Sequence, residues 1–155
     1  MLEVKTFPQD MSGLEVDRTE PRRCLVSGLF AEPVEVNGKA RRFYTYIHPG
    51  LVYNRPCVVV APPDDVPVLD YLEHGPWLAF AQEQDVFLHV LIPGENGWDL
   101  DGADADYMDR VYVQVNGRRG YVAMQDNIYA VGVGGGATVA QQAVMKMSSE
   151  FPKGL

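Results

Sequence analysis

Three short apolar segments constrain the fold of this 155-residue chain more than any other feature. The run "PCVVVAPP" (56–63) is continuously apolar, which is typical of strands covered on both faces of a sheet, and "DVFLHVLIPG" (85–94) is predicted to form a second buried strand. The run "NIYAVGV" (127–133) is predicted to form a third buried strand. Segments with helical spacing lie between and after these runs. The order therefore predicts an α/β sandwich with a largely parallel sheet and flanking helices.

A helix is expected after each of the three apolar runs. The first begins at Pro76 and Trp77 in "PWLAFAQEQ", because proline is tolerated at the first helical position. The second follows the loop 94–106, and its apolar positions recur at helical spacing: Tyr107, Met108, Val111, Tyr112 and Val115. The last helix is expected to bury one stripe of side chains: Ala137, Ala140, Ala143, Val144 and Met147.

The N-terminal part of the chain predicts an antiparallel hairpin instead. Residues 24–30 and 33–49 form two β segments joined through Asn37 and Gly38, a dipeptide that favours two-residue hairpin turns. Residues 1–22 are polar, contain two prolines and a glycine, and are predicted to be an extended arm. A single domain is therefore expected over residues 23–155.

Composition excludes several classes of partner. The formal net charge is −8 and no basic stripe is present, which argues against nucleic acid and anionic membrane surfaces as partners. The N-terminal "MLEVKTFPQD" does not resemble a signal peptide. No apolar run approaches the roughly 18 residues of a membrane-spanning helix. A cytoplasmic protein is predicted.

Cysteines and histidines give no sign of a metal or a cofactor. Cys24 and Cys57 are too few for a disulfide framework and are predicted to be buried thiols. His48, His74 and His89 are scattered, and no pair has metal-ligand spacing. Structural roles are expected for all three histidines, with no bound metal and no cofactor.

The stretch "IYAVGVGGGATVA" (128–140) predicts a strand, a tight glycine-rich turn and a helix. A phosphate-binding loop is the obvious competing interpretation, but no Lys-Ser or Lys-Thr follows the glycines. The dinucleotide pattern also fails, because Ala137 stands three residues after Gly134. A turn with a purely structural role is the third alternative.

In this context residues 24–150 resemble an α/β-hydrolase, especially the esterase and polyhydroxyalkanoate-depolymerase-like branch. The hairpin before the parallel strands, the "APPDD" segment and the run into "GVGGG" carry the resemblance. It implies a partial α/β-hydrolase domain, the N-terminal half of the sandwich, with a nucleophile elbow formed by Gly132, Val133 and Gly136. Gly134 stands at the position of the nucleophilic serine. Gly135 matches the residue whose N–H helps to bind the oxyanion.

The resemblance also implies that catalytic parts are missing. Gly134 offers no hydroxyl for a base to deprotonate. On the oxyanion side Pro62 and Pro63 have no N–H, while Asp64 and Asp65 have N–H groups but also carboxylates that repel an oxyanion. A solvated acidic loop is the simpler interpretation of these two aspartates. Two impaired features favour natural loss of activity over a single engineered change.

The family's acid and histidine follow the elbow helix, and this sequence ends about where the next strand is expected. The strand 128–133 would then be an exposed apolar edge that recruits another chain. A second chain that completes the fold is the favoured expectation; pairing of two copies and a cleaved precursor are the alternatives.

Three functions follow from these expectations. The first is a non-catalytic subunit that pairs with a chain completing the fold. The alternative is the N-terminal part of a split esterase whose active site is completed in trans, so involvement in catalysis stays open. The third is binding of a small molecule above the turn, where Trp98 is a candidate lining residue and Trp77 a weaker one.

Overall fold

The computed structural model describes residues 1–7, 24, 26–52, 55–116 and 128–147. Most of the predicted arm (8–22) lies outside these residues. Its first residues contribute β1 (Val4–Thr6), which pairs in parallel with the hairpin strand β2.

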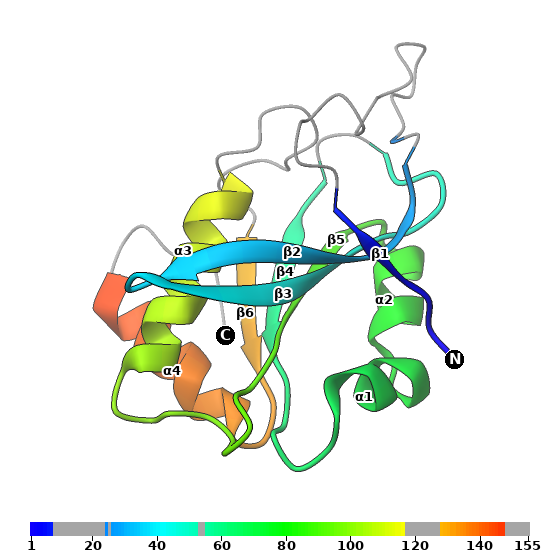
Figure 1. Cartoon of the computed structure of the whole chain (residues 1–155). Coiled ribbons are helices and arrows are strands. Elements are labelled where there is room, and N and C mark those ends of the chain that lie inside the picture. Colours follow the sequence, from blue (N-terminus) through cyan, green and yellow to red (C-terminus); the bar gives the residue numbers. More distant parts are fainter. Residues whose placement is uncertain (8–23, 25, 53–54, 117–127, 148–155) are drawn as a thin grey trace.

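Six strands form one mixed sheet in the order β1-β2-β3-β5-β4-β6 (Figure 1). After β1 come β2 (Gly28–Val36), β3 (Lys39–Ile47), β4 (Cys57–Ala61), β5 (Phe87–Leu91) and β6 (Ile128–Gly132). The strands β5, β4 and β6 are parallel to one another, and β3 joins them antiparallel to β5. The predicted alternation and the largely parallel central sheet are confirmed.

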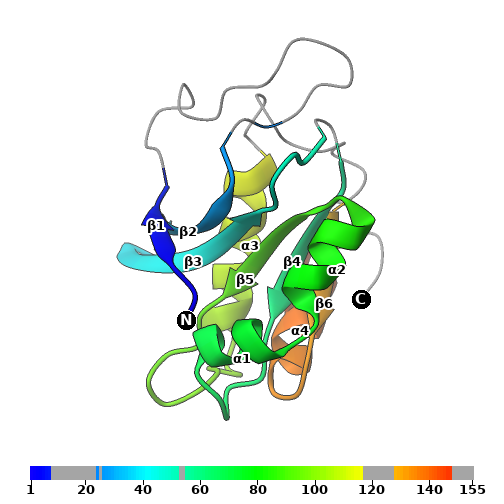
Figure 2. The same cartoon turned by 90° about the vertical axis from the view of Figure 1, so that its right-hand side faces the viewer.

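Helices cover both faces of this sheet (Figure 2). They are α1 (Val68–His74), α2 (Trp77–Gln84), α3 (Ala103–Asn116) and α4 (Gly136–Met147). Alternate residues of β4 enter different cores: Val59 packs on the α3 and α4 side, and Val58 and Val60 on the α1 and α2 side. All five residues of β4 and of β5 are buried, as the continuous apolar runs predict.

The hairpin turn has the predicted geometry. Asn37 has φ 51° and Gly38 has φ 79°, so both central residues are left-handed as a type I′ turn requires. Register follows from this turn, with Val36 opposite Lys39 and Phe43 opposite Glu32.

Four details differ from the sequence predictions. Helix α1 was not expected; it lies between Pro67 and Gly75, which bound it. Helix α3 begins three residues earlier than the predicted 106, and acidic residues in its first turn favour that end of a helix. Ala137 is exposed, and Val139 takes its place in the buried stripe of α4. Tyr129 in β6 is 37% exposed, because β6 is the last strand of the sheet in the described residues.

A row of polar side chains crosses the sheet beneath α3. Thr45 donates a hydrogen bond to Glu32, and its oxygen lies 2.9 Å from Nδ1 of His89. The Thr45 hydroxyl proton is used for Glu32, so His89 carries its own proton on Nδ1. His89 Nε2 is buried without a hydrogen-bond partner among the described residues, and burial lowers the pKa of His89 to about 3.

Because His89 is buried in this row, we expect the free energy of unfolding to depend on pH. The unfolded chain takes up a proton on His89 near pH 6.5, whereas the folded chain resists it down to about pH 3. The contribution of His89 to stability is therefore fully present above pH 6.5 and is lost progressively as the pH falls from about 6.5 towards about 3. Urea unfolding at pH 7.0, 5.5 and 4.5 measures the free energy of unfolding. We expect this free energy to fall less steeply with decreasing pH for His89→Leu than for the unchanged chain. His74→Gln is the control, because the His74 side chain is 78% exposed. If the free energy of unfolding changed equally with pH in all three proteins, His89 would not be the cause of the pH dependence.

Candidate functional site

The turn between β6 and α4 is the candidate site, and it has the shape of an elbow. Val133 N–H donates to the carbonyl of Ala61 at the end of β4 (3.0 Å), and Gly136 N–H donates to the carbonyl of Val133 (3.0 Å). Gly134 has φ 59° and is exposed at the apex. The sequence prediction of a strand, a tight turn and a helix is therefore confirmed, with its apex at Gly134.

Gly132 and Gly136 allow this helix to approach the sheet. A Cβ on Gly132 would lie 2.7 Å from the amide nitrogen of Ala137. A Cβ on Gly136 would lie 2.5 Å from the carbonyl carbon of Ala61 and 2.8 Å from the carbonyl oxygen of Pro62. These obstacles are backbone atoms and cannot rotate away, so any side chain at either position would force α4 from the sheet.

The carboxylate of Asp64 reaches the elbow from the end of β4. Oδ2 of Asp64 accepts a hydrogen bond from the N–H of Trp98 (2.9 Å). A Cβ on Gly135 would lie 2.9 Å from Oδ1, and a Cβ on Gly97, which has φ 85°, would lie 2.5 Å from Oδ2. Glycines on both sides thus leave room for this carboxylate. Asp64 is exposed, as a solvated loop predicts, but the sequence did not predict its attachment to Trp98.

Trp98 closes the other side of the elbow. Its ring N–H donates to the carbonyl of Pro62 (2.8 Å), and the side chain is only 8% exposed. Its Cδ1 lies 3.3 Å from where a Cβ on Gly135 would be. Trp98 therefore adjoins the predicted site, whereas Trp77 lies on α2, where its ring N–H donates to the Tyr71 hydroxyl (2.9 Å).

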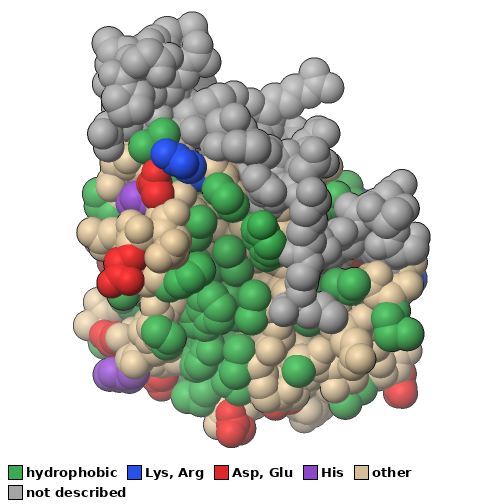
Figure 3. All heavy atoms as spheres, turned by 180° about the vertical axis from the view of Figure 1, so that it is seen from behind, with side chains coloured by type: hydrophobic (Ala, Val, Ile, Leu, Met, Phe, Trp, Pro, Cys, Tyr) green, Lys and Arg blue, Asp and Glu red, His purple; other side chains and the backbone are tan. Residues whose placement is uncertain are grey.

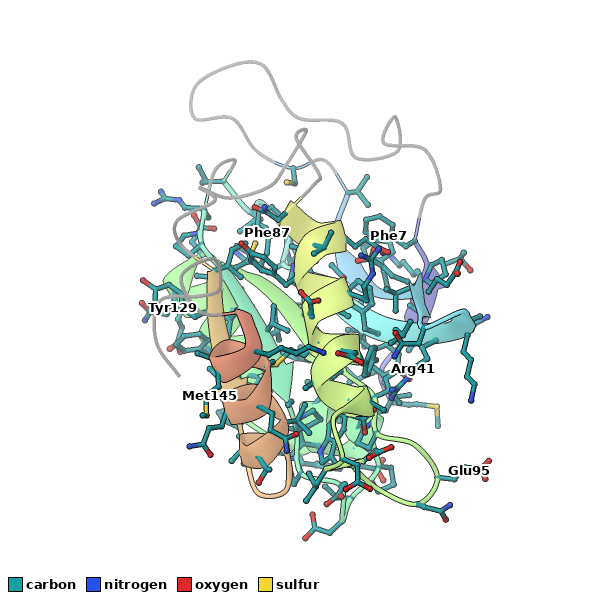
Figure 4. The ribbon with its side chains drawn as sticks, turned by 90° about the vertical axis from the view of Figure 1, so that its left-hand side faces the viewer. Phe7, Arg41, Phe87, Glu95, Tyr129 and Met145 are labelled. Carbon is teal, nitrogen blue, oxygen red and sulfur yellow. The ribbon has the colours of Figure 1, made fainter. Side chains whose placement is uncertain are left out.

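A second polar cluster fixes the loop that carries Trp98. Arg41, labelled in Figure 4, pairs with Asp104 (2.5 Å) and donates to the carbonyl of Ile92 (3.1 Å). Asp104 also accepts from the N–H of Asp99 (2.6 Å). The guanidinium stacks 3.6 Å above the Tyr107 ring. Both ends of the loop between β5 and α3 are thereby tied to β3.

The three histidines make their recorded contacts away from the elbow. His89 lies in the buried polar row. His48 Nε2 contacts Asp85 (2.8 Å), which also pairs with Arg55 (3.1 Å). His74 lies beside Glu73. None of the hydrogen bonds and ion pairs within the described part of the chain joins a histidine to the elbow.

The elbow offers little side-chain chemistry of its own, because residues 132–136 are four glycines and Val133. Gly134 brings no nucleophile. Beside Gly135 stands an anionic carboxylate, the opposite of the hydrogen-bond donors that stabilise an oxyanion. Asp64 also borders a cavity of about 470 Å³, together with Tyr44, Leu69 and Pro93, at the carboxyl ends of β4 and β5. Ligands of open α/β sheets bind at this end of the strands.

The described residues show neither a metal cluster nor a membrane-spanning helix. No group of three or more His, Cys, Asp or Glu residues among them is arranged to hold a metal ion. None of their helices is long and apolar enough to cross a membrane. Both cysteines are buried, as predicted, and burial raises the pKa of Cys24 to about 11.

Comparison with known proteins identifies the class of fold. No protein-family profile matches the sequence, and no curated protein matches it. Among solved structures the chain is similar to an S-formylglutathione hydrolase from Agrobacterium tumefaciens, with a TM-score of 0.59 and 12% sequence identity. The match covers 91% of this chain and 60% of that enzyme. The chain therefore has a mixed α/β sandwich fold like that of part of this hydrolase, and it spans about three fifths of that structure's length.

The close approach at Gly136 generates a stability prediction. Gly136→Ala should lower the free energy of unfolding by about 3 kcal/mol, because the added methyl collides with the backbone of Ala61 and Pro62. The higher helix propensity of alanine acts in the opposite direction by about 1 kcal/mol, so a loss isolates the packing effect. Gly94→Ala is the control, since its Cβ would meet nothing nearer than 3.7 Å. Urea unfolding of both variants tests this, and an unchanged midpoint for Gly136→Ala would contradict the packing.

Proposed function

We propose that this chain is a non-catalytic α/β-hydrolase-like subunit that pairs with another polypeptide completing the fold. The observation that carries the proposal is the bare elbow: Gly134 occupies the left-handed apex at φ 59° without a side chain. The elbow backbone is intact, while the group that attacks an acyl carbon in an enzyme of this kind is lacking.

Asp64 strengthens the non-catalytic interpretation. An oxyanion needs donors about 3 Å away and a site free of competing negative charge. Here the carboxylate of Asp64, held by the Trp98 N–H, lies against Gly135. An oxyanion formed beside Gly135 would be repelled by this charge. Replacement of a single residue would therefore not recover activity.

The sheet edge supports the need for a partner. Among the described strands β6 pairs only with β4, so within the described residues its other edge has no strand partner and could accept one. The similar hydrolase also contains residues outside the matched part, since the match covers 60% of its chain. A polypeptide supplying further strands would satisfy this edge.

The alternative function is a split esterase whose active site is completed in trans. The cavity of about 470 Å³ beside Asp64 favours it, because an exposed carboxylate there can orient a water molecule. Water would add to the acyl carbon, a partner histidine would accept its proton, and that proton would pass to the departing alcohol. Asp64 would then be a positioning residue.

Restoring the hydroxyl tests whether the remaining machinery exists. Gly134→Ser should hydrolyse p-nitrophenyl acetate no faster than Gly134→Ala, which has the same backbone strain without a hydroxyl. Neither variant should react with a fluorophosphonate probe, because no described histidine contacts the elbow. Labelling of Gly134→Ser alone would show a retained base and would contradict the non-catalytic proposal.

The assembled state separates the two functions. An affinity-tagged chain purified from its native cells should have a mass above the 17.2 kDa of one chain and contain a second polypeptide. The complex should not turn over short acyl esters, thioesters or amides. Turnover that falls at least tenfold in Asp64→Asn would favour the split esterase instead. A monodisperse 17.2 kDa monomer would contradict both functions.

A further inference from the structure

An apolar groove of about 540 Å³ runs along the outer part of the sheet, between α2 and β6. Trp77 and Phe80 of α2 form one wall, and Tyr129 and Val131 of β6 form the other, with Val58 of β4 at the floor. Figure 3 shows hydrophobic side chains gathered in the middle of this face, with acidic side chains at the margin. We call this the α2–β6 groove. Neither Asp64 nor any residue of the elbow (132–136) lines it.

The groove exists because the sheet is covered unequally. Helix α4 packs against β4 and β6 on one face. On the opposite face α2 packs against β5, and within the described part of the chain no helix lies over β6. Phe80 and Tyr129 are each 37% exposed as a result. A contiguous apolar surface of this kind marks an interaction site.

The spacing of the sheet defines what fills the groove. β6 is separated from β5 by β4 alone, so it lies about 9.5 Å from β5 at a strand spacing of about 4.8 Å. Two packed helices have their axes about 8–10 Å apart. A helix lying beside α2 would therefore lie directly over β6. The open space has the width of one α-helix.

We infer that the α2–β6 groove is the docking site for an amphipathic α-helix of the partner polypeptide. This rests on the proposed function and adds the surface and the chemistry of recognition. The helix contacts Trp77 and Phe80 on one side and Tyr129 and Val131 on the other, while a strand of the same polypeptide pairs with the free edge of β6. Basic side chains flank its apolar stripe, because Glu83 is exposed on α2 and the chain carries a net charge of −8.

The described helices α3 and α4 of a second copy offer no free apolar face to the groove. The apolar faces of α3 and α4 are already buried against their own sheet, in the same core. Each of these two helices exposes one large hydrophobic side chain, Val113 and Met145 respectively. Two copies would also bring together two chains of charge −8. These features favour the partner polypeptide over a second copy as the occupant.

Site-specific photocrosslinking of the full chain in its native cells tests the inference. The photoreactive amino acid p-benzoylphenylalanine replaces Phe80, Tyr129 or, as the matched control, Val113 of α3. We expect Phe80 and Tyr129 positions to crosslink one partner polypeptide, through a peptide with apolar residues at helical spacing. The Val113 position, 42% exposed on the other face, should give no such product.

Two charge substitutions complete the test. Phe80→Glu should reduce recovery of the complex at least tenfold, and Val113→Glu should not, with both variants showing the circular dichroism and melting temperature of the unchanged chain. Crosslinks solely between copies of this chain would overturn the assigned occupant. A hetero-complex that neither crosslinks at the groove nor responds to Phe80→Glu would overturn the groove and leave the proposed function standing. A chain found only as a monomer would overturn both.

Discussion

The contact between the backbones of α4 and β4 is the constraint on which the rest of the structure depends. Gly136 lies against the carbonyl of Ala61, and Gly132 against the first turn of α4. This approach directs the start of α4 over the end of β4 and places Gly134 at the apex of the elbow. It also fixes α4 across β4 and β6, so one face of the sheet is closed up to its last strand.

The same contact explains how Asp64 enters the elbow. Because α4 begins so close to Pro62, the loop after β4 passes directly beside Gly135. The loop after β5 then supplies the N–H of Trp98 to the Asp64 carboxylate. An anion therefore occupies the surroundings of the turn where a hydrolase presents donors. The tight turn and the carboxylate beside it are thus formed by segments that meet at the end of β4.

Local signals in the sequence were sufficient for much of the fold. Asn37 and Gly38 define their turn by their own φ angles, and the continuous apolar runs define β4 and β5. Contacts between segments distant in the sequence could not be predicted from such local signals. The bond from Trp98 to Asp64 spans 34 residues, and the exposure of Ala137 depends on how α4 is rotated on the sheet. The seven residues of α1 were too few to give a clear helical period.

The glycines of the elbow are needed for different physical reasons. Gly132 and Gly136 are required by packing, whatever the chemistry of the site. At Gly134 packing is less restrictive, because an added Cβ would approach only Pro63, at 3.2 Å or more. The left-handed φ of 59° is the main constraint there, since a residue with a side chain in this conformation is strained by about 1–3 kcal/mol. An enzyme must accept that strain to present a nucleophile. Glycine at the apex adopts this conformation without that strain.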